Sequence, residues 1–186
     1  MSGYLTDFIY HKNTFPKKLC DEIITAYTDE LFNRYTNQNN DRHLGEIQIS
    51  DHNVIDKKNS YIRKKIEQDI YNFIGTLIQD YKQTTNAEHL KVNQDIGYSL
   101  RQMSVGDFYA EHDDDGYGEE TGSRVLTVSI CLNQDYEGGE FTFFNENKIL
   151  TFKKGDVLVF PSSFMFPHGV KKITSGTRYQ LLTWLR

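Results

Sequence analysis

Three residues of this sequence have the types and the spacing of a metal-ligand set. His112 and Asp114 stand two positions apart, and His168 follows much later in the chain. Two histidines and one carboxylate form the facial triad of non-haem Fe(II) oxygenases, which leaves coordination positions open for other ligands. Imidazole and carboxylate suit Fe(II), but the same set also binds zinc well, so the ligand types alone leave both metals open.

Strand geometry explains how two of these residues can share one ion. Residues i and i+2 of a strand point to the same face, so His112 and Asp114 can reach a common point while Asp113 points away. His168 must then come from another strand that closes over that face. Taken singly, each has a plainer interpretation: an H-x-D pattern is usually surface polarity, and a histidine beside Pro167 is usually a turn residue.

A cation completes the pattern. Arg178 lies ten residues after His168, and by itself it would more often be a surface charge. Beside a metal with open positions, it suits a co-substrate with a keto acid at one end and a carboxylate at the other, which describes 2-oxoglutarate. The other histidines have no such context, and we expect them at the surface or in the core: His11, His43, His52 and His89.

Composition limits the class of protein. A chain of 186 residues favours one domain spanning 1–186. A net charge of -5 and a pI near 5.7 argue against a nucleic-acid partner. No apolar run reaches the roughly 18 residues of a membrane span, and the N-terminus lacks a signal-peptide pattern. Two cysteines far apart in the sequence, Cys20 and Cys131, favour a reduced, cytoplasmic protein.

The first half of the chain favours helices. Apolar residues recur at helical spacing over residues 15–32 and again over 60–83, where Lys and Glu occupy the other face. Residues 33–59 are polar and predict a loop with at most one edge strand. We therefore interpret residues 1–94 as a helical support region that covers one side of a sheet.

The second half favours short strands separated by turn signals. The expected strands are 96–103, 107–113, 124–132, 139–144, 148–152, 156–160, 168–173 and 178–185. Strands in this number, preceded by helices, predict an α+β fold that is mainly β. We expect a double-stranded β-helix, or jelly roll, over residues 95–186, with the N-terminal helices packed on one sheet.

Several stretches of this second half together resemble a known family. They are residues 106–114, 124–133, 136–141, 154–156, 160–161, 168–170 and 176–179, followed by Trp184. With them, residues 95–186 resemble the catalytic core of Fe(II)/2-oxoglutarate dioxygenases of the prolyl 4-hydroxylase type. Residues 19–24 resemble the first helix of that family more weakly.

The resemblance implies both a reaction and its site residues. His112, Asp114 and His168 would hold iron, and Arg178 would bind the distal carboxylate of 2-oxoglutarate. Fe(II), the co-substrate 2-oxoglutarate and O2 would be required, and ascorbate stays open as an additional cofactor. The product would carry a hydroxyl on a formerly aliphatic C–H, most simply on a proline of a protein or peptide substrate.

Two positions depart from the family pattern. Family members commonly carry tyrosines that contact 2-oxoglutarate at the places where this chain has Met103 and Cys131. Another hydroxyl must replace them, and the candidates are Tyr98, Tyr109 and Thr183.

The substrate is less determined. The acidic, glycine-containing stretch 115–122 follows the first ligand pair and suits either a lid that favours basic peptides or a plain solvated loop. A free amino acid or small metabolite is the alternative substrate. A different class also stays open, because the same fold serves cupin-like modules that bind a metal or ligand without oxidation.

Overall fold

The computed structural model describes residues 4–36, 42–49, 60–115 and 124–186. Its helices are η1 (Thr6–Phe8), α1 (Lys17–Tyr27) and α2 (Ser60–Thr85). Its first strands are β1 (Tyr10–Asn13), β2 (Asn33–Thr36), β3 (Arg42–Gln48), β4 (Ser99–Ser104), β5 (Phe108–His112) and β6 (Leu126–Cys131). The later strands are β7 (Tyr136–Gly138), β8 (Phe141–Phe143), β9 (Lys148–Leu150), β10 (Asp156–Pro161), β11 (His168–Val170) and β12 (Ile173–Leu185).

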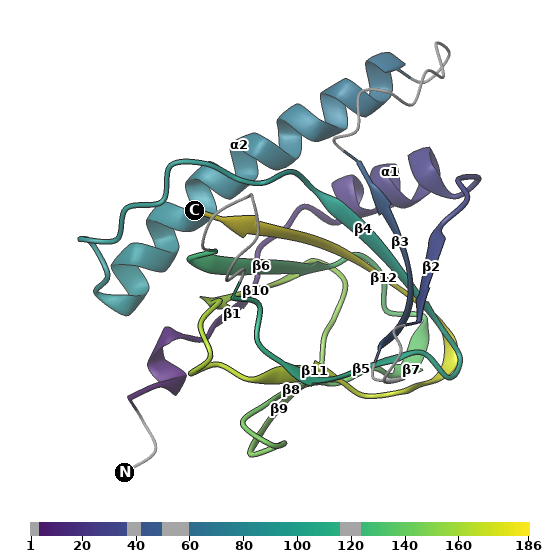
Figure 1. Cartoon of the computed structure of the whole chain (residues 1–186). Helices are drawn as coiled ribbons and strands as arrows, with labels where there is room; N and C mark the ends of the chain where they lie inside the picture. The colour runs from purple at the N-terminus through teal and green to yellow at the C-terminus, as the bar shows by residue number, and fades with distance from the viewer. Residues whose placement is uncertain (1–3, 37–41, 50–59, 116–123) are drawn as a thin grey trace.

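The described strands form one curled antiparallel sheet. Its order is β1-β10-β6-β12-β4-β3-β5-β11-β8-β9, with β2 added to β3 and β7 added to β12. The sheet bends back on itself and brings together strands that are far apart in this order. Phe160 of β10, for example, packs edge-on against Phe143 of β8 with ring centroids 5.0 Å apart. This arrangement confirms the predicted double-stranded β-helix (Figure 1).

The two long helices lie on one side of the sheet, as the sequence predicts (Figure 1). Helix α2 buries a stripe of residues three and four apart: Ile66, Ile70, Ile74, Leu77, Ile78 and Tyr81. Helix α1 is shorter than the predicted range 15–32. It ends at Tyr27, and Leu31 is 92% exposed, so Leu31 does not belong to the apolar face.

The polar region 33–59 contains more structure than predicted. Strand β3 is no edge strand: it pairs with β2 along one side and with β4 and then β5 along the other. Only Leu44 and Ile47 are apolar within it, and its place in the sheet depends on the backbone hydrogen bonds that the strands on both sides supply. Such pairing leaves little trace in hydrophobic periodicity, and the sequence therefore underestimates this strand.

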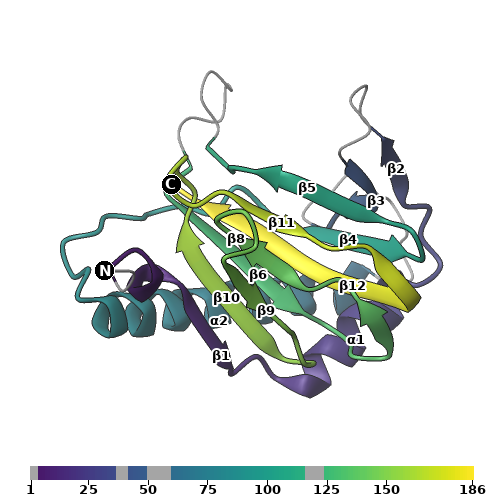
Figure 2. The ribbon, with the colours of Figure 1, turned by 90° about the horizontal axis from the view of Figure 1, so that it is seen from below.

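The packing of the helices and the curl of the sheet form two apolar cores. One lies between the helices and the sheet, and the other lies inside the curl, where Leu44, Met103, Phe141 and Phe160 are among its buried members. In Figure 2, seen from below, β5 and β11 run side by side along the near half of the curl. The inner core therefore surrounds the ends of the strands that carry His112 and His168.

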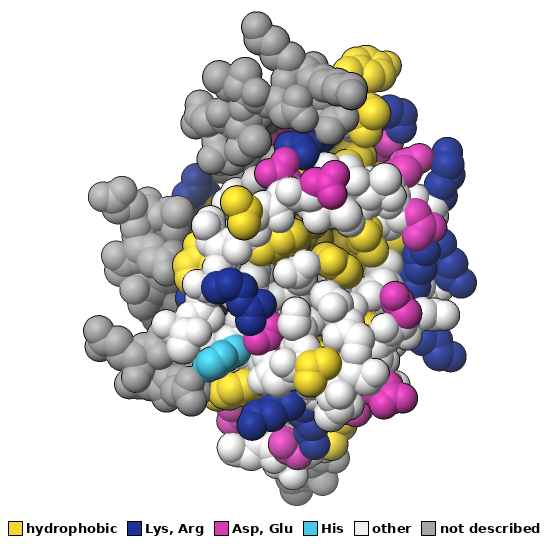
Figure 3. All heavy atoms as spheres, turned by 90° about the vertical axis from the view of Figure 1, so that its right-hand side faces the viewer, with side chains coloured by type: hydrophobic (Ala, Val, Ile, Leu, Met, Phe, Trp, Pro, Cys, Tyr) yellow, Lys and Arg dark blue, Asp and Glu magenta, His cyan; other side chains and the backbone are white. Residues whose placement is uncertain are grey.

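The surface offers few simple clues to a partner. On the described part of the face in Figure 3, basic and acidic side chains lie next to one another. Among the described helices, none combines the length and the hydropathy needed to cross a bilayer.

Candidate active site

The structure brings the three predicted metal ligands together. His112 ends β5, His168 begins β11, and the two residues stand directly opposite each other in the antiparallel pair. Asp114 follows two residues after His112, and its Oδ1 lies 3.6 Å from His112 Nε2 while its Oδ2 lies 3.3 Å from His168 Nε2. One ligand atom from each residue lies within 4.8 Å of the others, which is close enough to share one ion.

Backbone carbonyls orient both imidazoles. His112 Nδ1 donates to the carbonyl of Ala110 at 2.9 Å, and His168 Nδ1 donates to that of Phe166 at 3.0 Å. A hydrogen on each Nδ1 leaves the Nε2 lone pair free to bind a metal, and both Nε2 atoms face Asp114. Two imidazoles and one carboxylate fit Fe(II) by their chemistry.

The Asp114 carboxylate is buried and held by a threonine. Thr127 Oγ1 donates to Asp114 Oδ2 at 2.8 Å, and the same hydroxyl contacts Ser162 Oγ at 3.0 Å. Burial by itself raises the pKa of the Asp114 carboxyl, but the His168 and His112 imidazoles outweigh burial and lower the pKa well below its usual range. The carboxylate is therefore ionised at neutral pH and ready to bind a cation.

Aromatic rings close the walls around the ligands. Tyr109 stacks on the His112 ring with centroids 3.7 Å apart. Phe141 stacks on His168 at 5.2 Å, and Phe160 meets the same imidazole edge-on at 4.7 Å. These contacts restrict both imidazoles to one orientation and keep water away from one side of the site.

Arg178 lies buried inside the same curl. Its exposed fraction is 0%, its Nη1 contacts the thioether sulfur of Met103 at 3.6 Å, and its guanidinium lies over the Phe152 ring at 5.6 Å from the centroid. The Nε and Nη2 groups have no hydrogen-bond partner among the residues that the structure describes. An unpaired buried guanidinium is costly unless a ligand supplies an anion, and a carboxylate matches its paired donors. This environment fits the distal carboxylate of 2-oxoglutarate.

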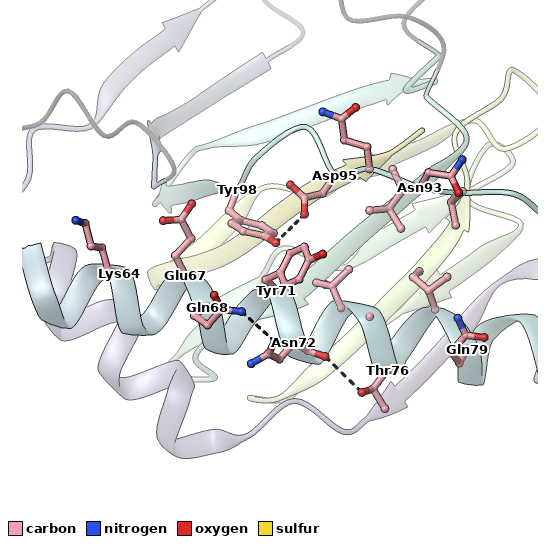
Figure 4. A pocket seen from close by; sticks show the side chains of 16 residues that line it. Lys64, Glu67, Gln68, Tyr71, Asn72, Thr76, Gln79, Asn93, Asp95 and Tyr98 are labelled. Carbon is pink, nitrogen blue, oxygen red and sulfur yellow. Dashed lines mark hydrogen bonds between the residues drawn. The ribbon is translucent and has the colours of Figure 1, made fainter.

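Only one of the three predicted replacement hydroxyls borders the metal site. Tyr109 lines the cavity with His112, although its hydroxyl already accepts from Arg42 Nη1 at 3.3 Å. Tyr98 lies instead in a groove beneath α2, where its hydroxyl donates to Asp95 at 2.9 Å (Figure 4). Thr183 donates to the carbonyl of Gly97 at 2.7 Å and does not line the cavity.

The expectation for Tyr98 and Thr183 is therefore corrected. Each stands five positions from a residue that points into the curl, Met103 in one case and Arg178 in the other. Residues an odd number of positions apart on a strand point to opposite faces, so this alternation already places Tyr98 and Thr183 outside the curl.

Several cavity residues were missing from the sequence interpretation, and Gln180 and Thr127 are two of them. Gln180 is buried two positions after Arg178, and its amide donates to Ser129 at 2.5 Å. Thr127 supports Asp114 as described above. The sequence could have indicated Gln180, because it lies an even number of positions from Arg178 and therefore points to the same side of the strand. It could not have indicated Thr127, because the contact of Thr127 with Asp114 depends on how the strands meet. Within the acidic stretch 115–122, all residues but Asp115 lie outside the described residues.

Replacing Thr127 by valine is expected to lower the affinity for divalent metal by about 10- to 100-fold, the usual cost of losing an outer partner of a ligand. The change keeps the side-chain shape and removes the hydroxyl that donates to Asp114. Titration calorimetry with Mn(II) measures the effect. Thr183→Val is the matched control, because its hydroxyl faces Gly97; equal affinities in the two variants would contradict the supporting role of Thr127.

Comparisons with known proteins agree with this geometry. A family model described as the 2OG-Fe(II) oxygenase superfamily matches residues 98–186. A PKHD-type hydroxylase of Colwellia psychrerythraea is 29% identical over 127 residues, which cover 65% of this chain and 55% of that protein. The chain thus spans little more than half the length of that relative. A putative prolyl 4-hydroxylase of Acanthamoeba polyphaga mimivirus is 28% identical over 200 aligned positions, covering 98% of this chain and 75% of that protein.

A solved structure shows the same fold. It is the viral collagen prolyl hydroxylase of Paramecium Bursaria Chlorella virus-1 in complex with 2OG. The TM-score is 0.68 at 17% sequence identity, and the match covers 96% of each chain.

Proposed function

We propose that the chain is a 2OG-Fe(II) oxygenase of the prolyl hydroxylase type. Its substrate in this proposal is a proline of a peptide or protein, which it hydroxylates. One observation carries the proposal: a His-Asp-His set and a buried guanidinium with unpaired N–H groups share the inside of one curled sheet. Relatives named as PKHD-type hydroxylase and putative prolyl 4-hydroxylase, and a structural neighbour named as collagen prolyl hydroxylase, support the substrate class.

Each described residue would have a distinct role. His112, Asp114 and His168 would hold Fe(II), and Arg178 would bind the distal carboxylate of the co-substrate. When bound, iron and 2-oxoglutarate supply the activation of O2 that yields succinate, carbon dioxide and a hydroxylated product. The protein positions the reacting C–H bond and excludes water.

A cleft outside the metal ligands suits a peptide. It has a volume of about 500 Å³ and begins at His112 and Asp114. It continues past Trp184, whose ring carries the Arg124 guanidinium at 3.9 Å, toward Tyr35 of β2. The size falls within the usual range for ligand sites. A free amino acid would fill only a small part of it, and this supports a chain of several residues as substrate.

The compartment and ascorbate belong to the same proposal. Cys20 and Cys131 are both buried, unpaired thiols, which supports a reducing, cytoplasmic setting. Ascorbate dependence is a family expectation, to be tested by adding ascorbate to the assay below.

Succinate formation tests the function. With Fe(II), 2-oxoglutarate and O2, we expect slow succinate release without substrate and faster release with a proline-containing peptide. The same peptide should gain one oxygen atom, in a ratio to succinate close to one. Zn(II) in place of Fe(II) is the control and should give no turnover.

Two other results of this assay would each support one of the alternative functions. Stimulation by free amino acids alone would favour a metabolite as the substrate. Metal and 2-oxoglutarate binding without any succinate would favour a non-oxidative binding module.

A further inference from the structure

A second strong donor that the sequence did not reveal lies next to Arg178. Tyr136 begins β7, which pairs with β12, and its ring lies in the inner core near the guanidinium. Gly139, at φ +67°, lies between the two side chains. A Cβ at Gly139 would stand 3.5 Å from the Tyr136 ring and 3.4 Å from Arg178 Cδ, so both side chains pack against the same glycine.

Sulfur atoms are the neighbours of both donors. Arg178 Nη1 contacts Met103 Sδ at 3.6 Å, and the Tyr136 hydroxyl contacts Cys131 Sγ at 3.4 Å. The single S–H of Cys131 donates to the carbonyl of Asn133 at 3.0 Å, so the Tyr136 hydroxyl is the donor in its contact with sulfur. Thioether and thiol sulfurs are weak acceptors. In these contacts both donors therefore meet only weak acceptors.

The Tyr136 phenol and the Cys131 thiol both remain protonated. Burial raises the pKa of the Tyr136 phenol and outweighs the opposing effect of the Arg178 cation, so the phenol stays protonated and can donate. Burial also raises the pKa of the Cys131 thiol, and the thiol therefore does not supply an anion to Arg178. A ligand carboxylate would replace two weak sulfur contacts with two charge-assisted hydrogen bonds.

We infer that Tyr136 and Arg178 together form the clamp for the distal carboxylate of 2-oxoglutarate, an assignment that rests on the proposed function. Met103 and Cys131 stand where the resembling family carries tyrosines, and in this chain both positions contribute sulfur. Tyr136 supplies the missing hydroxyl from a different strand. It is a binding residue for the co-substrate and has no role at the metal.

Ligand truncation tests the clamp without any turnover. The Mn(II)-loaded full chain is titrated calorimetrically with 2-oxoglutarate and with 2-oxobutyrate, which has the same keto acid and no distal carboxylate. Tyr136→Phe should weaken 2-oxoglutarate binding by roughly 10- to 100-fold, as for a lost hydrogen bond to a charged group. Its affinity for 2-oxobutyrate should equal that of the unaltered protein.

Two further variants make the result specific. Tyr98→Phe is the matched control, because that hydroxyl donates to Asp95 beneath α2, and it should bind 2-oxoglutarate normally. Arg178→Met should lose affinity for 2-oxoglutarate at least as strongly as Tyr136→Phe. If Arg178→Met loses affinity and Tyr136→Phe does not, the clamp assignment is wrong while the proposed function stands.

The remaining outcomes are equally decisive. An equal loss of both ligands in Tyr136→Phe would show that the phenol supports the pocket's structure only, and would overturn the inference. Unchanged affinity in both Tyr136→Phe and Arg178→Met would overturn the co-substrate site itself, and the proposed function with it.

Discussion

Replacing His168 by alanine is expected to abolish metal-dependent succinate formation and to weaken metal binding more than loss of an outer partner would, which costs about 10- to 100-fold. His168 is 4% exposed and supplies one of the three ligand atoms. Without it, Asp114 and His112 provide two ligands, and the Asp114 carboxylate loses an imidazole that favours its ionised form. Calorimetry with Mn(II) measures binding, and succinate release measures turnover.

A histidine outside the site provides the control. His89 is exposed in the segment after α2, and His89→Ala should retain both metal affinity and turnover. Because Phe141 and Phe160 pack on His168, the melting temperature of His168→Ala without metal must be measured as well. A folded His168→Ala protein with full metal-dependent turnover would exclude the His-Asp-His assignment.

Replacing Arg178 by methionine is expected to separate stability from function. The guanidinium is fully buried with no carboxylate partner among the described residues, and such a charge costs free energy that an apolar side chain does not. The unliganded variant should therefore melt at the same temperature as the unaltered protein or higher. Its 2-oxoglutarate binding should weaken by roughly 2–5 kcal/mol, as for truncating one partner of a buried charge pair.

Thermal shift measures both effects in one experiment. A ligand at one hundred times its Kd stabilises the folded state by about 2.7 kcal/mol, so 2-oxoglutarate should raise the melting temperature of the unaltered protein much more than that of Arg178→Met. Arg63→Met should show the opposite pattern, because Arg63 of α2 pairs with Glu30 far from the pocket. It should melt lower and keep the full ligand shift. A full ligand shift retained by Arg178→Met would remove Arg178 from the co-substrate site.

Much of the site could be predicted from local sequence because strand geometry fixes it. The two-residue step from His112 to Asp114 sets one face, and the residue types limit the metal to ions such as Fe(II) and zinc. Arg178 points inward by the same alternation. Apolar periodicity likewise predicted both long helices and most strands of the second half, since each of them buries one face.

Local sequence could not determine which elements meet across the curl. β3 joins the sheet through backbone pairing with β2 on one side and with β4 and β5 on the other, and backbone hydrogen bonds are nearly independent of side-chain type. Tyr136 reaches Arg178 because β7 pairs with β12 and the glycine at 139 lets both side chains approach. Thr127 reaches Asp114 from another strand in the same way. The sequence by itself determined which residue types could bind a metal and which face of its strand each side chain occupies. The tertiary structure decided which hydroxyl groups lie next to Asp114 and Arg178. Those contacts join residues whose separation along the chain carries no periodic signal.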